Sequence, residues 1–175
     1  MNIYLIGYRC SGKTSVGSYI ASIMGTPFID ADQELVKDAG MPISKIVDDK
    51  GWDFFRELEK QTIKKISGFS QKHVVATGGG VILKAENIEV MKKSGVVIWL
   101  KVNSETIKKR MFLDETTKEF RPSLTSKSLD KEIEDTLLER IPLYEKAKDF
   151  SIETDNISIE DTAALIKDYL IRTKN

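Results

Sequence analysis

The sequence predicts an α/β fold in which an open, mostly parallel sheet is covered by helices on both faces. Three observations support this prediction. Short apolar runs alternate with segments of helical periodicity along all 175 residues. A glycine-bearing phosphate-binding motif separates the first apolar run from the first helical segment. No internal repeat, low-complexity tract or linker interrupts the alternation, so we expect a single domain over residues 1–175.

The first strand is predicted over Asn2 to Ile6, an apolar run that ends at Gly7 and is too short for a helix. We expect it to be the central strand. The helix after the phosphate-binding motif should present one apolar stripe, made of Val16, Tyr19, Ile20, Ile23 and Met24. Gly25 is predicted to end that helix, because glycine adopts the left-handed conformation of a C-terminal cap at low cost.

A second short strand is predicted over Pro27 to Ile29, with Asp30 at its end. The stretch from Gln33 to Ser67 is rich in helix-forming residues but is interrupted near Gly40–Pro42 and at Gly51. Because glycine and proline break helices, we expect two or three helices in this stretch.

The second half continues the alternation, beginning with a third strand over His73 to Ala76. The later elements are predicted as a helix over 86–93, a strand over 96–102, helices over 104–112 and 130–147, the latter kinked at Pro142, and a last strand over 149–153. Residues 113–128 are polar and turn-like. Ser158 with Asp161 predicts a capping box for a final helix. One face of that helix should carry Ile159, Ala163, Ile166 and Leu170.

Composition and charge favour a small-molecule partner over nucleic acid. The chain has 27 Lys+Arg and 27 Asp+Glu, so it has no overall basic field to neutralise a phosphate backbone. Its one cysteine, Cys10, cannot form an intrachain disulfide, and its one histidine, His73, cannot supply the histidine pair of common zinc sites. The apolar run at the start is shorter than the roughly seven to fifteen residues of a signal sequence. We therefore expect a cytoplasmic protein without nucleic-acid or membrane partners.

The segment Gly7-Tyr8-Arg9-Cys10-Ser11-Gly12-Lys13-Thr14 matches the phosphate-binding pattern G-x-x-x-x-G-K-[ST]. Glycines are needed there because backbone N–H groups must turn inward and touch phosphate oxygens, while the following helix adds partial positive charge. Lys13 is predicted to reach the β- and γ-phosphates, and Thr14 to be a Mg²⁺ ligand through its hydroxyl. The expected ligand is a nucleoside triphosphate, held by Cys10, Ser11, Gly12, Lys13, Thr14 and Ser15.

Two carboxylates follow the second predicted strand, at Asp30 and Asp32. Ligands of open α/β sheets bind beyond the carboxyl ends of the strands, so both side chains should face the phosphate loop. One could approach the metal while the other approaches an acceptor hydroxyl. The alternative is an aspartate that caps the next helix, beside a solvated neighbour.

A second glycine cluster, Thr77-Gly78-Gly79-Gly80, follows the third strand at the same edge of the sheet. A plain turn needs only one glycine, so three favour close approach of the backbone to a small ligand. Three arginines are further candidates: Arg56 on an amphipathic helix, Arg121 in the polar segment and Arg140 before the last strand. Taken alone, each is typical of a solvated residue, and only convergence on one cleft would make them a binding group.

The motifs together resemble shikimate kinase. They are GYRCSGKT, FIDAD, GWDFFRELE, VVATGGG, RPSL and ERIPLYEKA, in the order and approximate spacing of that family. The resemblance covers nearly the whole chain. It implies a P-loop NTPase with a nucleoside-monophosphate-kinase-like, five-stranded parallel sheet, substrate-binding helices over about 31–67 and a lid over about 113–128. The implied activity is ATP-dependent phosphorylation of the 3-hydroxyl of shikimate, in aromatic amino acid biosynthesis.

The resemblance also implies roles for individual residues. Lys13 would support the transferred phosphoryl group, Thr14 and Asp30 would hold Mg²⁺, and Asp32 would contact the ring hydroxyls and accept a proton. Shikimate would be bound by Arg56, Gly78, Gly79, Gly80 and Arg140. ATP would be bound by Arg121 and by Arg110, the latter near the adenine. The expected partners are shikimate and ATP, and the expected state is a monomer.

Two residues depart from the family pattern. Cys10 stands where the family usually has another loop glycine, and Trp52 stands where we expect an acidic residue that would anchor Arg56. The Cys10 thiol could be reactive beside the helix N-terminus, or it could be a small apolar side chain tucked under the first helix. Two other functions compete with the kinase: a noncatalytic module that binds nucleotide or a protein, and a kinase for another polyol acid such as gluconate.

Overall fold

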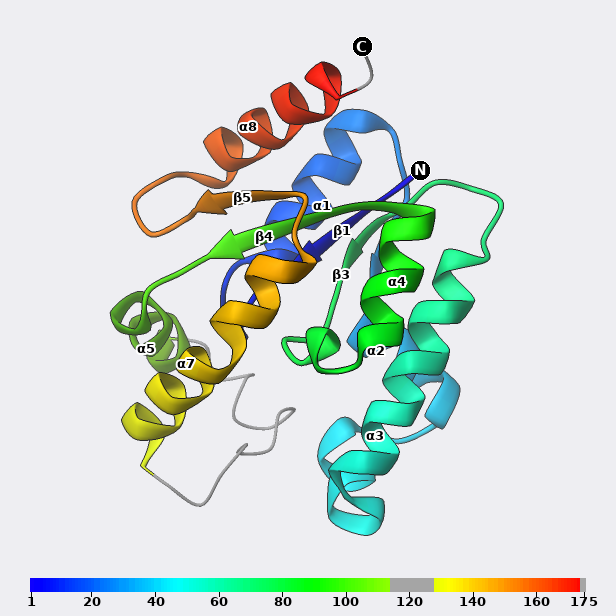
Figure 1. The fold of residues 1–175 in the computed structure, drawn as a ribbon, viewed down its shortest axis with the longest axis vertical. Coiled ribbons are helices and arrows are strands. Elements are labelled where there is room, and N and C mark those ends of the chain that lie inside the picture. The colour runs from blue at the N-terminus through cyan, green and yellow to red at the C-terminus, as the bar shows by residue number, and fades with distance from the viewer. Residues whose placement is uncertain (114–127, 174–175) are drawn as a thin grey trace.

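The structure, a computed structural model, describes residues 1–113 and 128–173 and confirms the predicted fold class. Five parallel strands lie in the order β2-β3-β1-β4-β5, with helices on both faces of the sheet (Figure 1). The strands are β1 (Asn2–Ile6), β2 (Phe28–Asp30), β3 (Val74–Ala76), β4 (Gly95–Lys101) and β5 (Phe150–Glu153). The helices are α1 (Lys13–Met24), α2 (Ala31–Ala39), α3 (Ile43–Ser67), the 3₁₀ turn η1 (Val81–Leu83), α4 (Ala85–Ser94), α5 (Ser104–Leu113), α7 (Leu129–Ala147) and α8 (Ile159–Arg172).

The central position of β1 is confirmed, and its sequence explains it. All five residues of β1 are buried, which requires a strand that is covered by neighbours at both edges and on both faces. Its neighbours bring the ends of three strands together, because Leu5 pairs with Ala76 and Asp30 pairs with Ala76 from the other side. The loops that follow β1, β2 and β3 therefore open at one edge of the sheet, where a site can form.

Two hydrophobic cores fill the space between the sheet and its helices. The core under α1 and α8 contains Leu5, Val16, Ile20, Ile98, Ile152, Ile166 and Leu170. The core under α3, α4 and α7 contains Tyr4, Ile6, Ile63, Ile66, Met91, Val97, Trp99 and Tyr144. Trp99 stacks on Tyr144 with ring centroids 5.3 Å apart, which ties α7 to β4. Alternate residues of β1 thus serve opposite faces, as the two-residue period of a strand requires.

The predicted apolar stripe of α1 is wrong at its C-terminal end. Val16 and Ile20 are buried, but Ile23 is 48% exposed and Met24 is 37% exposed. The buried face runs through Gly17 and Ala21 instead, and a Cβ at Gly17 would lie only 2.7 Å from the ring of Phe28. Small residues form this face because the helix lies close to the sheet, and close approach turns the larger side chains of the last turn outward.

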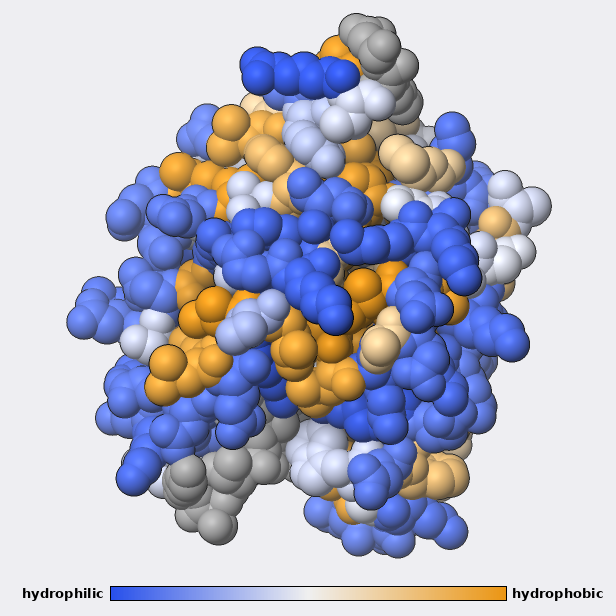
Figure 2. Space-filling view, viewed as in Figure 1, coloured by the Kyte–Doolittle hydropathy of each residue, from blue (hydrophilic) through white to orange (hydrophobic). Residues whose placement is uncertain are grey.

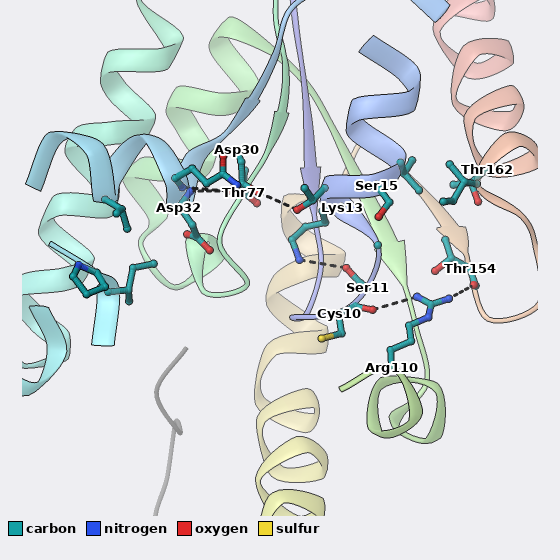
Figure 3. Close-up of a pocket in the computed structure, with 18 of the residues that line it drawn as sticks. Cys10, Ser11, Lys13, Ser15, Asp30, Asp32, Thr77, Arg110, Thr154 and Thr162 are labelled. Atoms are coloured by element: carbon teal, nitrogen blue, oxygen red, sulfur yellow. Dashed lines mark hydrogen bonds between the residues drawn. The ribbon is translucent and has the colours of Figure 1, made fainter. Parts of the chain in front are cut away.

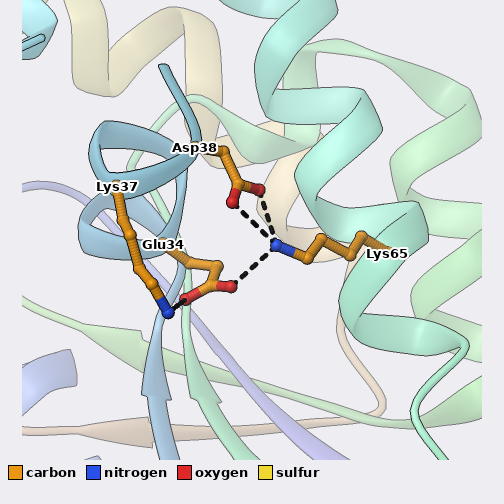
Figure 4. Close-up of polar contacts among 4 residues, drawn as sticks. All are labelled: Glu34, Lys37, Asp38 and Lys65. Atoms are coloured by element: carbon orange, nitrogen blue, oxygen red, sulfur yellow. Dashed lines mark hydrogen bonds and ion pairs between the residues drawn. The ribbon is translucent and has the colours of Figure 1, made fainter. Parts of the chain in front are cut away.

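The predicted interruptions of the helical stretch after β2 are confirmed. Gly40 ends α2 with a φ of 68°, and Gly51 has φ 82° and ψ 170°, which divides α3 into two helical segments. An exposed ion-pair cluster joins the two helices: Lys65 Nζ of α3 lies 2.9 Å from Glu34 Oε1 and 2.7 Å from Asp38 Oδ2 of α2 (Figure 4). These carboxylates raise the pKa of the Lys65 ammonium by hydrogen bonding.

The last two helices form where they were predicted, while the predicted kink at Pro142 stays a prediction. Ser158 caps α8, accepting a hydrogen bond from the Asp161 backbone N–H at 3.0 Å, and Pro142 lies inside one continuous helix, α7. Ala163 is buried on the predicted face of α8, but Ile159 is 40% exposed. Ile159 belongs to the first turn, which borders a cavity rather than the core.

The surface carries hydrophilic side chains over most of the face drawn in Figure 2, with apolar residues gathered in its middle. Exposed apolar residues of α5 and α7 include Phe112, Leu113, Leu138 and Ile141. In residues 1–113 and 128–173, no helix is both long and apolar enough to span a membrane.

Candidate active site

Two cavities open at the carboxyl edge of the sheet and share a wall at Asp32. The larger, the nucleotide cavity, has a volume of about 1200 Å³ and is lined by the phosphate loop, α2 and the start of α8. The smaller, the acceptor pocket, has a volume of about 60 Å³ and is lined by α3, the glycine cluster and α7. A side chain at their junction can reach ligands in both.

The phosphate loop takes a backbone conformation that its glycines permit. Gly7 has φ 147° and Gly12 has φ 92°, and a Cβ on Gly7 would lie 2.7 Å from the carbonyl oxygen of Leu100. Cys10 is the only non-glycine residue of the described chain with positive φ, at 59°. That conformation accounts for the usual glycine at this position, because a side chain there costs about 1–2 kcal/mol.

Lys13 lies at the start of α1 with its ammonium turned into the loop. Its Nζ donates to the carbonyl oxygens of Gly7 at 2.9 Å and Tyr8 at 2.7 Å, and lies 3.3 Å from Ser11 Oγ (Figure 3). The side chain is buried and lines the nucleotide cavity. This places a cation beneath the surface on which phosphate groups would rest.

Thr14 and Asp30 form an oxygen pair that suits Mg²⁺. The Thr14 hydroxyl donates to Asp30 Oδ2 at 2.9 Å, while Asp30 Oδ1 accepts from the backbone N–H groups of Asp32 and Gln33. Asp30 therefore caps α2, as the alternative interpretation proposed, and faces the phosphate loop as well. Magnesium is commonly held by one or two protein oxygens together with substrate phosphates, so this pair fits the ion without a larger cluster. Among the described residues, no group of three or more His, Cys, Asp or Glu side chains is placed to hold a metal ion.

Arg110 bridges two walls of the nucleotide cavity. Its guanidinium donates to the carbonyl oxygens of Cys10 at 3.2 Å and Thr154 at 2.8 Å, as Figure 3 shows. The far wall is formed by Ile157, Ser158, Ile159 and Thr162. The predicted adenine contact of Arg110 stays a prediction, and its place in the cavity wall is compatible with it.

Arg56 is buried in the acceptor pocket and is held by a residue that the sequence analysis missed. Its Nη1 donates to Glu59 Oε2 at 2.8 Å, one turn further along α3. The guanidinium carbon also lies 5.4 Å from the ring centroid of Trp52 and 5.0 Å from that of Phe55. Trp52 thus supports Arg56 through its ring rather than through a carboxylate, and Glu59 supplies the charge. The i, i+3 spacing of Arg56 and Glu59 was the available signal.

The three glycines are needed for space and not for a left-handed turn, since none has a positive φ. A Cβ on Gly80 would lie 2.3 Å from Arg56 Nη2. A Cβ on Gly78 would lie 2.7 Å from Glu59 Oε1 and 2.8 Å from Asp32 Oδ1. The backbone therefore passes between these charged groups at a distance that any side chain would prevent.

Arg140 and Tyr144 reach the glycine cluster from α7. Arg140 Nη1 donates to the Gly79 carbonyl at 3.2 Å, and the Tyr144 hydroxyl donates to the same oxygen at 2.5 Å. Burial raises the pKa of the Tyr144 hydroxyl, so it stays protonated and able to donate. The bond to Gly79 holds Arg140 at the glycine cluster, and both Arg140 and Arg56 line the acceptor pocket.

A second buried ion pair, between Arg9 and Glu132, was also missed. It joins the phosphate loop to the first turn of α7, and both side chains are buried. Tyr8 and Arg9 line the acceptor pocket together with Glu59. Burial raises the pKa of the Glu59 carboxyl, against the opposing effect of the Arg56 guanidinium. No local pattern links Arg9 to a residue 123 positions away.

The structure brings most predicted site residues into these two cavities. The nucleotide cavity is lined by Cys10, Ser11, Gly12, Lys13, Thr14, Ser15, Asp30, Asp32 and Arg110. The acceptor pocket is lined by Asp32, Arg56, Gly78, Gly79, Gly80 and Arg140. Arg121 and most of the predicted lid, 113–128, lie outside the described residues. Two of the three candidate arginines, Arg56 and Arg140, therefore converge on one cleft.

Known proteins resemble this chain over nearly its whole length. The sequence model of the shikimate kinase family matches residues 9–170. The shikimate kinase of Thermodesulfovibrio yellowstonii is 41% identical, with 96% of this chain and 94% of that protein covered. The solved structure of shikimate kinase from Acinetobacter baumannii in complex with shikimate superposes with a TM-score of 0.91 at 32% identity, covering 99% of this chain and 94% of that one. Shikimate kinase from Aquifex aeolicus gives 0.80 at 30% identity, with 99% and 98% covered.

A family match over this span, together with relatives above 30% identity and a common fold, leaves one assignment. The chain belongs to the shikimate kinase family.

Proposed function

We propose that this chain transfers the γ-phosphoryl group of ATP to the 3-hydroxyl of shikimate, giving ADP and shikimate 3-phosphate for aromatic amino acid biosynthesis. Family membership supports the reaction. The observation that carries the assignment of residues is the position of Asp32, which lines both the nucleotide cavity and the arginine-lined acceptor pocket. A kinase needs such a junction, because the donor phosphate and the acceptor hydroxyl must meet in line.

On the nucleotide side, the phosphate loop binds the triphosphate through backbone N–H groups and the N-terminus of α1. Lys13 exchanges its bonds with the loop carbonyls for phosphate oxygens and stabilises the charge of the transferred group. Thr14 and Asp30 hold Mg²⁺ in the proposed complex. Bound Mg²⁺ neutralises charge on the β- and γ-phosphates.

On the acceptor side, the guanidinium groups of Arg56 and Arg140 bind the shikimate carboxylate, since planar forks match a carboxylate in two-pronged geometry. Glu59 keeps Arg56 in place, and the Gly79 carbonyl keeps Arg140 in place. The absence of side chains on Gly78 and Gly80 leaves room for the charged groups of Asp32, Arg56 and Glu59 at the wall of the pocket.

Asp32 then acts on the hydroxyl that attacks. Its carboxylate accepts the proton of the 3-hydroxyl while the hydroxyl oxygen bonds to the γ-phosphorus and the bond from that phosphorus to the bridging oxygen of ADP breaks. The proton ends on Asp32, and the leaving charge ends on ADP. Asp32 suits this role because it is half-buried beside Gly78, within reach of the acceptor pocket.

Further parts of the proposal concern the chain as a whole. Arg121 would contact the ATP phosphates from a lid over about 113–128 that excludes water, with substrate-binding helices over about 31–67 in a single domain. A cytoplasmic protein without nucleic-acid or membrane partners remains the prediction from composition and sequence, and a monomer remains what the resemblance implies.

Coupled measurement of ADP formation with shikimate, with gluconate and without an acceptor tests the proposed function. We expect turnover that depends on shikimate and is lost in Lys13→Met. Turnover with gluconate instead would support the kinase for another polyol acid. ATP binding without turnover on either acceptor would support the noncatalytic module.

A further inference from the structure

The acceptor pocket gathers buried polar atoms that lack partners within the protein. Five buried side-chain atoms of the described residues have no hydrogen-bond partner, namely Tyr8 Oη, Arg9 Nε, Glu59 Oε1, His73 Nδ1 and Asn87 Oδ1. The first three belong to residues that line the acceptor pocket. Such atoms cost stability in a folded protein, so a cluster of them at one pocket indicates groups kept for a ligand.

The proposed mechanism uses neither Tyr8 nor Arg9, and of these two Arg9 is already held in an ion pair with Glu132. The Tyr8 ring packs with Ile107, Met111 and Ile133, and only 2% of the residue is exposed. The Arg9 guanidinium carbon lies 5.6 Å from the centre of the ring. An arginine offers only donors, so the hydrogen of the Tyr8 hydroxyl still lacks an acceptor.

The hydroxyl belongs to the acceptor pocket rather than to the other hollow that Tyr8 borders. That hollow, of about 410 Å³, lies between β4 and α7 and is lined by Trp99, Leu137 and Ile141. The charges that act on the hydroxyl are those of Arg9, Glu132 and Arg140. Arg9 and Arg140 line the acceptor pocket, and none of these three charged residues lines the hollow.

We propose that Tyr8 is a further substrate-binding residue, whose hydroxyl donates a hydrogen bond to the carboxylate of the acceptor beside Arg140. This inference rests on the proposed function, because it takes an acid as the acceptor. Burial raises the pKa of Tyr8, so the hydroxyl is protonated and can serve only as a donor to an anionic partner or to another acceptor oxygen. A carboxylate is the appropriate partner, since the Arg140 guanidinium adds a positive charge at this end of the pocket, beside the Arg9–Glu132 ion pair.

The melting temperature of the free protein distinguishes a ligand-binding hydroxyl at Tyr8 from a structural one. Removing a hydroxyl whose hydrogen has no acceptor costs the free protein little, whereas removing one that is fully bonded costs more. Tyr8→Phe should therefore keep the melting temperature of the free protein at or above that of the wild type. It should raise the Kd for shikimate about tenfold, the effect expected of one hydrogen bond to a charged group, and leave the Kd for ATP unchanged.

Tyr4→Phe is the matched control. The Tyr4 hydroxyl is buried and lies 2.8 Å from Ser94 Oγ and 3.0 Å from Asn2 Nδ2, on β1 and away from both cavities. Its loss should lower the melting temperature and leave the Kd for shikimate unchanged. The same loss of a hydroxyl should therefore change the Kd for shikimate but not the melting temperature at Tyr8, and the melting temperature but not the Kd at Tyr4.

Calorimetry with shikimate and with its methyl ester, alongside thermal melts, completes the test. The tenfold loss in Tyr8→Phe should be much smaller with the ester, whose carbonyl oxygen accepts only a neutral hydrogen bond. A loss that persists in full with the ester would overturn the carboxylate assignment. Equal shikimate affinity in wild type and Tyr8→Phe, or a melting temperature lowered as in Tyr4→Phe, would overturn the role of Tyr8. A wild type that neither binds nor phosphorylates shikimate would overturn the proposed function itself, whereas the melting comparison would still report on the hydroxyl.

Discussion

The two cavities are built by different means. The nucleotide cavity, at about 1200 Å³, is shaped by backbone, through the positive φ of Gly7 and Gly12 and a lysine held by loop carbonyls. The acceptor pocket, at about 60 Å³, is shaped by charged side chains packed against glycines. A triphosphate can be bound by a contiguous loop, because its many oxygens meet successive N–H groups. A small acid requires a few side chains brought from distant parts of the chain.

Two of the three arginines that line the acceptor pocket are paired with carboxylates. Glu59 neutralises Arg56, and Glu132 neutralises Arg9. Within the part of the chain that the structure describes, Arg140 forms no ion pair, and its Nη1 donates to the Gly79 carbonyl. The paired arginines gain a fixed position, while the unpaired cation at Arg140 supplies attraction for an anion. Substitutions that act on one cavity and not the other test whether the two cavities work independently.

The largest effect is expected where the cavities meet. Asp32→Asn keeps the size of the side chain but removes the group that accepts the proton, so turnover should fall by about two orders of magnitude or more. ATP binding should remain nearly intact. Steady-state kinetics with nucleotide titration checks both. Asp53→Asn, an exposed carboxylate on the same substrate-binding segment, is the control and should turn over normally. Near-full turnover of Asp32→Asn would contradict its proposed role.

A smaller and selective effect is expected from arginines of the two cavities. Arg56→Lys and Arg140→Lys keep the charge but lose the planar fork, so each should weaken shikimate binding by about tenfold and leave ATP binding little changed. Arg110→Lys should do the reverse, because it loses its bonds to the Cys10 and Thr154 carbonyls in the nucleotide wall. Calorimetric titration with each ligand measures the crossover. If all three variants weakened both ligands alike, the two cavities would not be separate recognition units.

The nucleotide cavity was predictable from the sequence because its main determinants are local. Gly7 to Thr14 form one contiguous motif between a strand and a helix, and Asp30 follows the next strand at a sheet edge that topology alone brings near. The order of elements was predictable for the same reason, since each strand and helix has its own period. The error in α1, where Gly17 and Ala21 face the core in place of Ile23 and Met24, shows what local periodicity leaves out. Close packing favours small residues, which periodicity does not count as apolar.

The acceptor pocket was predictable only in part. The resemblance to a family supplied Arg56, Arg140 and the glycines, but nothing in the sequence indicated the partners that hold them. Glu132 pairs with Arg9 across 123 positions, a contact that only the packing of α7 against the phosphate loop creates. Tyr8 reads as one variable position of a phosphate-binding pattern. Burial and the lack of a hydrogen-bond partner become visible only when the surrounding side chains are in place.

Gly80→Ala changes the acceptor pocket by adding one methyl group and no charge. The new methyl group would lie 2.3 Å from Arg56 Nη2, and the flexible guanidinium must yield. We expect shikimate affinity to fall several-fold, as for displacement of one charged hydrogen-bonding group, and the melting temperature to fall as well, because the buried ion pair of Arg56 with Glu59 must move. Gly68→Ala is the control, because its Cβ would meet only ordinary contacts at 3.5 Å and its φ of −84° suits alanine. Unchanged shikimate affinity in Gly80→Ala would mean that the position of Arg56 does not limit binding.

The smallest effect is expected at Cys10, which lies between the nucleotide cavity and an apolar cluster. Its backbone belongs to the phosphate loop, yet its half-buried side chain packs against the apolar cluster of Tyr8 and Ile107 while bordering the nucleotide cavity. Because it is the only cysteine, labelling with a small maleimide followed by mass spectrometry reports on this site alone. We expect slow labelling in the free protein and slower labelling with Mg·ATP, since phosphate oxygens in the loop would cover the exposed part of the thiol. Shikimate alone should leave the rate unchanged, because the acceptor pocket does not include Cys10. A labelling rate indifferent to nucleotide would assign the thiol to the apolar cluster and remove it from the nucleotide cavity.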